Sequence, residues 1–449
     1  MPPDDPVIAH ASAIEQTYRL CNGLYLLGGM ERGVTLYNQQ VRAHNLIWAL
    51  WELHRHGNRD LGKVAVVGGG AAGLTATAAL LSRLGASVSV TLFERLWDLC
   101  PLQQGSDTRW LHPKIYSWPD RGSRAPAASL PILNWSEGRA SDIARILTRG
   151  FGEYCEQFAT KPESLAILVG IRNFHLRARE LTIDWVGTRT ERAGAFFRLG
   201  KSEGDESVFE TVILAAGFGL EQRVPAYETA PYWRNEQIAQ PHLEGERRNF
   251  VVSGYGDGAL VDLCRLTIER FRQDTILYEL FGSELEDFEA HMRDRLEGVD
   301  STSNLFPIFR AMDSSLLARA RAALAARVRK DTSVVLHISG KDKKTASLSD
   351  IFGPTSSRLN RLLTYLLHRC GAFATSLSDL DSCVRAHRAT ADAVLCRHGA
   401  NTREHLRAII TDYEHVDARL DEMKHMQAQS AVRLWRPGAF PMTQQRTQR

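Results

Sequence analysis

The residues with the clearest chemical use are the glycines of the segment Gly68-Gly-Gly-Ala-Ala-Gly73. They follow the apolar run Val64–Val67, which is typical of a strand buried on both faces, and they precede an Ala/Leu-rich helix expected at 71–84. In such a GxGxxG turn the first glycine allows the tight turn, the second lets the backbone approach a pyrophosphate, and the third lets helix and strand pack closely. The helix amides then face the phosphates. The predicted dinucleotide contacts here are Gly68, Gly70, Ala71, Ala72 and Gly73.

An acidic residue stands where the fingerprint needs one. Glu94 follows the second expected strand, Val88–Phe93, about 20 residues after the last glycine of the turn. A carboxylate at a strand end accepts hydrogen bonds from the hydroxyls of an adenosine ribose. We therefore add Glu94 and its neighbour Arg95 to the predicted cofactor contacts.

The region after this unit predicts an antiparallel meander. Apolar runs separated by turn-rich segments lie at 165–169, 181–185, 195–199 and 208–215. With this pattern the chain resembles the pyridine-nucleotide-linked FAD oxidoreductases, a group that includes thioredoxin reductases and flavin-containing monooxygenases, over about residues 61–280. Those enzymes interrupt their FAD unit with such strands and return to the sheet in an "ATG" segment, which Thr211–Gly217 resembles. The resemblance implies FAD as the cofactor, with Ala216 and Gly217 close to it.

A second glycine turn follows at Gly254-Tyr-Gly-Asp-Gly-Ala259. It resembles the GxGDxA turn that binds NAD(P)H in thioredoxin-reductase-like enzymes. We expect Glu279 to end the next strand, 275–279, where an acid suits a ribose 2′-hydroxyl and repels a 2′-phosphate, so NADH is favoured over NADPH. A vestigial domain without ligand stays the alternative. The predicted contacts are Gly254, Gly256, Asp257, Gly258, Ala259 and Glu279.

The loop 110–119 carries the candidate catalytic residues His112, Tyr116 and Trp118. A histidine exchanges protons near neutral pH, and aromatic rings stack on a flavin. The alternative is a rigid packing loop rich in proline and aromatic residues. Because His112 and Trp118 are six apart, the segment does not reproduce the His-x-x-x-Trp-Pro motif of Baeyer–Villiger monooxygenases.

Three further observations narrow the function. None of the seven cysteines forms a CxxC pair, which argues against dithiol reduction. His337 and His398 are expected to be structural histidines with satisfied hydrogen bonds. No metal site is expected.

The composition indicates a globular protein with ordinary partners. With 449 residues the chain is long enough for two or three domains, and a net charge of +3 does not favour nucleic-acid binding. The amino terminus lacks a signal peptide and no apolar run is long enough to span a bilayer, so we expect a cytoplasmic protein without membrane contact. The expected domains are an N-terminal strand–helix extension, an FAD-binding domain, an NAD(P)-binding-like domain and a mainly helical C-terminal region, at 1–60, 61–235, 236–345 and 346–449.

These observations predict an α/β fold. It has a parallel FAD-binding sheet with an antiparallel meander, an inserted smaller Rossmann-like unit and C-terminal helices. The favoured function is an FAD-dependent oxidoreductase whose flavin is reduced by NADH or NADPH and reoxidised by oxygen or a small organic acceptor. An FAD oxidase or dehydrogenase with a vestigial nicotinamide site is one alternative, and an FAD-bound regulatory or scaffolding protein is another. Whether the chain forms a homo-oligomer stays open.

Overall fold

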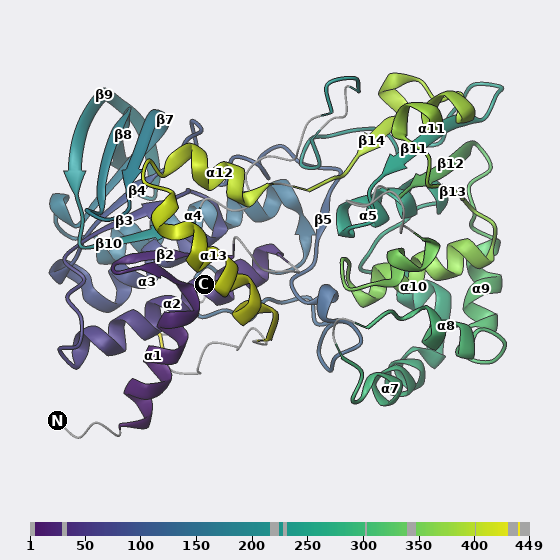
Figure 1. Ribbon diagram of the computed structural model, residues 1–449, viewed down its shortest axis with the longest axis horizontal. Helices are drawn as coiled ribbons and strands as arrows, with labels where there is room; N and C mark the ends of the chain where they lie inside the picture. The colour runs from purple at the N-terminus through teal and green to yellow at the C-terminus, as the bar shows by residue number, and fades with distance from the viewer. Residues whose placement is uncertain are drawn as a thin grey trace, which may run out of the picture. The chain divides into compact units, whose positions relative to one another are not determined.

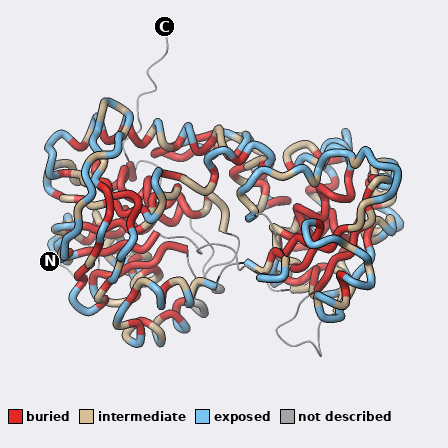
Figure 2. The backbone as a smooth tube through the Cα atoms, turned by 90° about the horizontal axis from the view of Figure 1, so that it is seen from above, coloured by how far each residue is buried: buried red, intermediate tan, exposed pale blue. Residues whose placement is uncertain are grey.

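The chain folds into two compact units, each with its own buried core (Figure 2). The computed structural model describes residues 5–28, 34–215, 224–227, 231–300, 303–338, 347–399, 401–429 and 439–440. The first unit comprises Met1–Asp107, Ala127–Gly219 and Asn401–Arg449. The second comprises Thr108–Pro126 and Leu220–Ala400, so it is inserted twice into the sequence of the first. The division into four consecutive domains, expected from the sequence, remains a prediction.

An eight-stranded sheet forms the centre of the first unit, in the order β1-β2-β10-β3-β4-β7-β8-β9. Strands β2, β10, β3, β4 and the start of β7 pair in parallel, whereas β7, β8 and β9 pair antiparallel, which confirms the predicted meander. The strands span Arg19–Cys21, Leu24–Leu26, Thr211–Leu214, Lys63–Val67, Ser89–Phe93, Leu165–Arg177, Thr182–Ala193 and Phe196–Val208 in that spatial order. The short strand β6, Gly138–Arg139, also belongs to this unit.

Helices cover this sheet on both faces, because alternate residues of its buried strands point to opposite sides. On one face, Ala65 and Val67 of β3 share a cluster with Leu406, Val416 and Leu420 from two helices near the C-terminus. These are α12 and α13, drawn in yellow beside the sheet in Figure 1. Helices α1 to α4 pack in succession on one another. The six helices span Pro6–Tyr18, Leu36–Arg55, Ala71–Leu84, Ala140–Phe158, Thr402–Ile409 and Glu414–Gln429.

The N-terminal region differs from the prediction. The segment Val34–Tyr37 resembles a short strand in sequence, but Thr35 is the N-cap of α2 and its hydroxyl accepts a hydrogen bond from the Asn38 amide at 3.1 Å. The strands of this region are β1 and β2, which pair with each other, and β2 also pairs in parallel with β10, so both belong to the large sheet. Helix α1 begins at Pro6 behind the capping carboxylate of Asp5.

The second unit is built on a four-stranded parallel sheet in the order β13-β12-β11-β14. These strands span Ala374–Ser376, Thr332–His337, Arg248–Ser253 and Val394–Cys396, and β5 spans Trp110–Leu111. The order reverses at β11, as in Rossmann-like folds, which confirms the predicted smaller α/β unit. Its helices are α5 to α11, at Asp257–Thr267, Ile276–Phe281, Leu285–Leu296, Phe306–Met312, Ala318–Ala325, Arg358–Arg369 and Leu380–His387.

The strand predicted at 275–279 is wrong. This segment begins helix α6, and the strand that pairs beside β11 is β12. Ile276, Leu277 and Leu280 are all buried, a spacing that helix α6 satisfies on one face. The run was too short for its periodicity to separate helix from strand. Within the described residues, no helix combines the length and the apolar character needed to cross a membrane.

Candidate functional site

The first glycine turn has the geometry that its sequence predicts. Gly68 has a φ of 115°, in the region that favours glycine, and its amide donates to the Phe93 carbonyl at 2.7 Å. A Cβ on Gly73 would lie 1.8 Å from the Gly68 carbonyl oxygen, so helix α3 starts in direct backbone contact with the turn. Each of these positions therefore requires glycine for a stated steric reason.

The start of α3 fits a phosphate group. Gly70 is the N-cap, it supplies no side-chain hydrogen bond to the helix, and a Cβ placed on it would meet no atom within 4 Å. Amides in the first turn of a helix have no partner inside the helix, and the helix dipole favours an anion there. Ala71, Ala72 and Gly73 are buried, and none of them carries more than a methyl group that could block the approach to their amides.

Glu94 lies against the turn, directly after β4. Its Oε2 accepts from the Gly69 amide at 2.6 Å and its Oε1 accepts from the Leu96 amide at 2.7 Å. Burial raises the pKa of the Glu94 carboxyl, while these amide donors act in the opposite direction. Each carboxylate oxygen has a further lone pair, so the group retains acceptors for ribose hydroxyls. Arg95 is exposed beside it.

Two residues that the sequence did not single out support this turn. The Cys100 amide donates to the Gly69 carbonyl at 2.8 Å, and the Leu99 side chain lies 3.0 Å from where a Cβ on Gly69 would be. No sequence motif marks either residue. Each supports the turn only because the loop after β4 brings it against Gly69. Ala216 and Gly217 lie outside the described residues, so their predicted contacts stay predictions.

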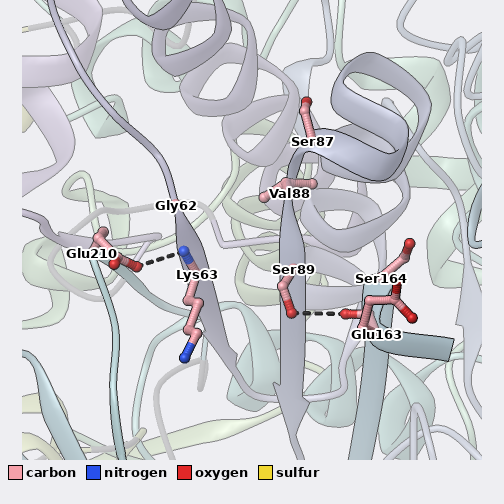
Figure 3. Close-up of a pocket in the computed structure, with 8 residues that line it drawn as sticks. All are labelled: Gly62, Lys63, Ser87, Val88, Ser89, Glu163, Ser164 and Glu210. Atoms are coloured by element: carbon pink, nitrogen blue, oxygen red, sulfur yellow. Dashed lines mark hydrogen bonds between the residues drawn. The ribbon is translucent and has the colours of Figure 1, made fainter. Parts of the chain in front are cut away.

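A shallow hollow of about 280 Å³ in the first unit lies elsewhere. Figure 3 shows it between the starts of β3 and β4, flanked by Glu210 and Glu163. The Lys63 amide donates to Glu210, and the Ser89 hydroxyl donates to the Glu163 carbonyl. Since the glycine turn follows the carboxyl end of β3, this hollow is at the opposite edge of the sheet from the candidate dinucleotide site.

The second glycine turn is also formed. Gly254 has a φ of 121°, and a Cβ on it would lie 2.4 Å from the Arg397 carbonyl oxygen. Gly256 is the N-cap of α5 without a side-chain hydrogen bond, and Ala259 is fully buried where the helix packs on the sheet. Gly258 faces the Tyr232 ring, with 3.5 Å between the ring and a Cβ placed on the glycine.

Asp257, the acid of this turn, has internal partners. Its Oδ1 accepts from the Ser357 amide and from the Asn360 side chain, both at 2.7 Å. These donors belong to the start of α10, so Asp257 joins two helix N-termini and benefits from their positive ends. Burial raises the pKa of the Asp257 carboxyl, and the two donors offset part of that effect.

A buried ionic cluster is centred on Asp262, a residue of α5. The Asp262 carboxylate is fully buried, is paired with Arg109, and accepts from Nε of Arg397 at 2.8 Å. Burial by itself would raise the pKa of Asp262, but Arg109 and Arg397 outweigh it and lower this pKa to about 2. The Tyr232 ring lies 4.0 Å from the Arg109 guanidinium carbon, a cation–π contact. The cluster fixes the helix whose first turn is the candidate phosphate site.

Glu279 is not at a strand end. It lies on α6, accepts from the Thr275 hydroxyl at 2.6 Å, and is ion-paired with Arg327. The physical basis for assigning it to a ribose was its expected place after a parallel strand, and helix α6 removes that basis.

The three candidate catalytic residues belong to the second unit. His112 is buried, and its Nδ1 accepts from the amides of Lys114 and Ile115 at 3.2 and 3.1 Å. Burial lowers the pKa of His112, so the ring is neutral at pH 7.

The two aromatic candidates pack into the core of that unit. Trp118 is fully buried and donates from Nε1 to the Glu289 carboxylate at 2.9 Å, and Tyr116 packs beside it against the same core. These contacts are those of a packing loop, the alternative left open from the sequence.

Comparison with known proteins gives one family. Residues 66–102 match the family described as an NAD(P)-binding Rossmann-like domain. The match spans the first glycine turn, α3, β4 and Glu94, and it confirms the dinucleotide-binding fold predicted for this segment. It supports the resemblance to pyridine-nucleotide-linked flavin oxidoreductases.

No curated protein matches the chain. Among solved structures, the chain is similar to a polycyclic ketone monooxygenase from the thermophilic fungus Thermothelomyces thermophila. The identity is 12%, the coverage is 90% of this chain and 74% of the other, and the TM-score is 0.32. A likeness at this level says nothing about the reaction of this chain.

Proposed function

We propose that this chain is an FAD-dependent oxidoreductase with the ADP half of FAD bound at the first glycine turn. The observation that carries the proposal is the contact between the turn and the carboxylate, in which the Gly69 amide donates to Glu94 at 2.6 Å. It brings a ribose acceptor next to the first turn of α3, so acceptors for the ribose and donors for the pyrophosphate of an ADP group lie side by side. The meander of β7, β8 and β9 favours FAD over NAD here, through the resemblance named above.

Each residue of this site has a defined task in binding. The amides of Ala71, Ala72 and Gly73 would hold the pyrophosphate at the start of α3, and Gly70 adds no side chain to the approach. The Glu94 carboxylate accepts from ribose hydroxyls and orients the adenosine. When bound, the flavin ring supplies the redox chemistry, and the protein supplies its position and surroundings.

The second glycine turn is the proposed site of the electron donor, a nicotinamide dinucleotide. Gly254 and Gly256 repeat the geometry of the first turn, and α5 presents its N-terminus behind them. The predicted preference for NADH depended on Glu279 at the end of a strand. Because Glu279 lies on helix α6, NADH and NADPH are both candidate donors. Oxygen or a small organic molecule is the proposed acceptor.

One observation favours a flavin oxidase or dehydrogenase with a vestigial donor site. Glu279, the acid expected to bind the ribose of the donor, lies on helix α6 and is ion-paired with Arg327 instead of ending a strand beside the turn. In that case the reducing equivalents would come directly from an organic substrate.

The test is anaerobic mixing of the purified full-length protein with NADH or NADPH. Our proposal predicts that the visible absorbance of bound oxidised flavin falls rapidly with one of them. A protein that holds flavin but is reduced by neither supports the oxidase alternative. A colourless protein that does not take up added FAD would refute the flavin assignment.

A further inference from the structure

Three polar side chains meet at the carboxyl edge of the second sheet. Ser253 is the last residue of β11, His337 is the last residue of β12, and His398 follows the end of β14. The Ser253 hydroxyl oxygen lies 2.7 Å from Nδ1 of His337 and 2.7 Å from Nε2 of His398. Ser253 is fully buried and His337 is 4% exposed, whereas His398 is only half-buried. The outer member of this chain of hydrogen bonds therefore reaches the surface.

For a neutral His337 ring, its partners set the direction of each hydrogen bond between Ser253, His337 and His398. Nε2 of His337 lies 2.8 Å from the Ser378 carbonyl oxygen, which only accepts, so Nε2 donates. A neutral imidazole that donates from Nε2 accepts at Nδ1, and the Ser253 hydroxyl must donate to it. The Ser253 oxygen then accepts from Nε2–H of His398. His398 is left with a lone pair on Nδ1, and burial lowers the pKa of its ring, which keeps the ring neutral at pH 7.

This lone pair is carried by a residue next to the second glycine turn. The Arg397 carbonyl oxygen is the atom that a Cβ on Gly254 would strike, and the Arg397 amide donates to the Ser253 carbonyl at 2.8 Å. His398 is the next residue, so its ring leaves the backbone beside the turn. Its ring is held there by the serine at the end of β11.

The strand order decides which half of a dinucleotide would pass His398. The sheet reverses at β11, with β12 on one side and β14 on the other. In Rossmann-like folds a dinucleotide lies across such a reversal, its pyrophosphate at the glycine turn and its adenosine over the next strand of the fold. Here that strand is β12, so the other nucleotide half passes the end of β14 and His398.

We propose that Nδ1 of His398 accepts a hydrogen bond from a hydroxyl of the ribose on the nicotinamide side of a dinucleotide at the Gly254–Ala259 turn. Ser253 and His337 are positioning residues that hold the ring in the accepting tautomer. A lone pair suits a sugar hydroxyl, which donates, and does not suit a phosphate oxygen, which accepts. The inference deepens the proposed function and rests on its donor site.

The experiment compares two probes that differ by this ribose. ADP-ribose contains it and ADP lacks it, so affinities for both are measured by calorimetry on full-length protein saturated with FAD. His398→Ala should weaken ADP-ribose binding about fivefold, the value of one ordinary hydrogen bond, and change ADP binding less than about twofold. His398→Asn should retain most of the affinity, because its amide oxygen takes the place of Nδ1.

The matched control is His387→Ala, on α11 of the same unit. The His387 ring bonds the Ser333 carbonyl at 3.0 Å, and the proposal gives it no ligand contact. Both affinities should stay at the wild-type value in this variant. Melting temperatures of all variants are recorded, and the Asn variant decides the matter if the Ala variant does not fold.

Several results would overturn the inference. Unchanged ADP-ribose binding by His398→Ala would do so, and so would an equal loss for ADP and ADP-ribose, which indicates a merely structural role. Wild-type protein that binds no ADP-ribose would overturn the inference together with the donor site. If ADP-ribose binding depends on His398 while NADH and NADPH leave the flavin oxidised, only the proposed reaction fails and the inference stands.

Discussion

The substitution Gly70→Ala separates cofactor binding from folding at the first turn. Gly70 has φ −80° and ψ −177°, an extended conformation that alanine adopts without strain, and the added Cβ meets no protein atom within 4 Å. The stability of the apoprotein should therefore change by less than about 1 kcal/mol. In the complex, the same Cβ would stand where the pyrophosphate approaches the backbone.

The expected loss of FAD affinity follows from the hydrogen bonds that this methyl group disturbs. A hydrogen bond to a charged group contributes about 1.5–3 kcal/mol, so weakening one raises the dissociation constant about 10- to 150-fold. Gly73→Ala is the contrasting variant, because its Cβ would lie 1.8 Å from the Gly68 carbonyl oxygen and must displace the backbone. It should destabilise the apoprotein by about 1–3 kcal/mol, which lowers the melting temperature by several degrees.

The assay is reconstitution of apoprotein with FAD, followed by quenching of flavin fluorescence, together with thermal unfolding of each apoprotein. The reasoning predicts weak binding with normal stability for Gly70→Ala, and reduced stability for Gly73→Ala. Wild-type FAD affinity in the Gly70→Ala protein would refute it, because a dinucleotide on this turn cannot avoid the added methyl group.

Three further predictions concern the second unit. Asp262→Asn should lower the free energy of unfolding by about 3–5 kcal/mol, since it removes the one carboxylate shared by the buried Arg109 and Arg397, whereas Asp142→Asn, at a half-exposed side chain, should cost less than about 1 kcal/mol in the same urea titration. Because the Asp262 pKa is about 2 in the fold and 3.8 as the ordinary value, its stabilisation is present above about pH 4 and is lost as the pH falls toward 2, and this part of the acid dependence should vanish in Asp262→Asn. Glu279→Gln should leave the ratio of kcat/KM for NADH and NADPH within about twofold, because Glu279 is paired with Arg327 on α6; a tenfold shift in steady-state assays would restore its predicted role. Trp118→Phe should lower stability by about 1 kcal/mol through loss of the bond to Glu289 and leave the flavin content of the purified protein unchanged, and a flavin-free variant would contradict this.

Much of the first site could be predicted because its signals are local. The strand, turn, helix and second strand lie within residues 63–94. The steric reason for a glycine there comes from residues nearby in the sequence, as the contact of Gly73 with Gly68 shows. The same holds for the meander, whose strands pair with their sequence neighbours. Short-range patterns of this kind are set by backbone sterics and side-chain alternation, which are legible in a single sequence.

The predictions of secondary structure failed where packing between distant segments outweighs the local conformational preference of the residues. The apolar run at 275–279 suits a strand or a short helix equally, and burial of one face in the second core makes it α6. Thr35 has strand propensity but caps α2.

Contacts between residues far apart in the sequence could not be predicted from it. Asp262 meets Arg109 across 153 residues, and Ser253 meets His398 across 145. Motifs thus located the two glycine turns. The tertiary structure decided the buried charges and hydrogen bonds around them, because residues far apart along the chain are brought together only by the packing of the whole unit.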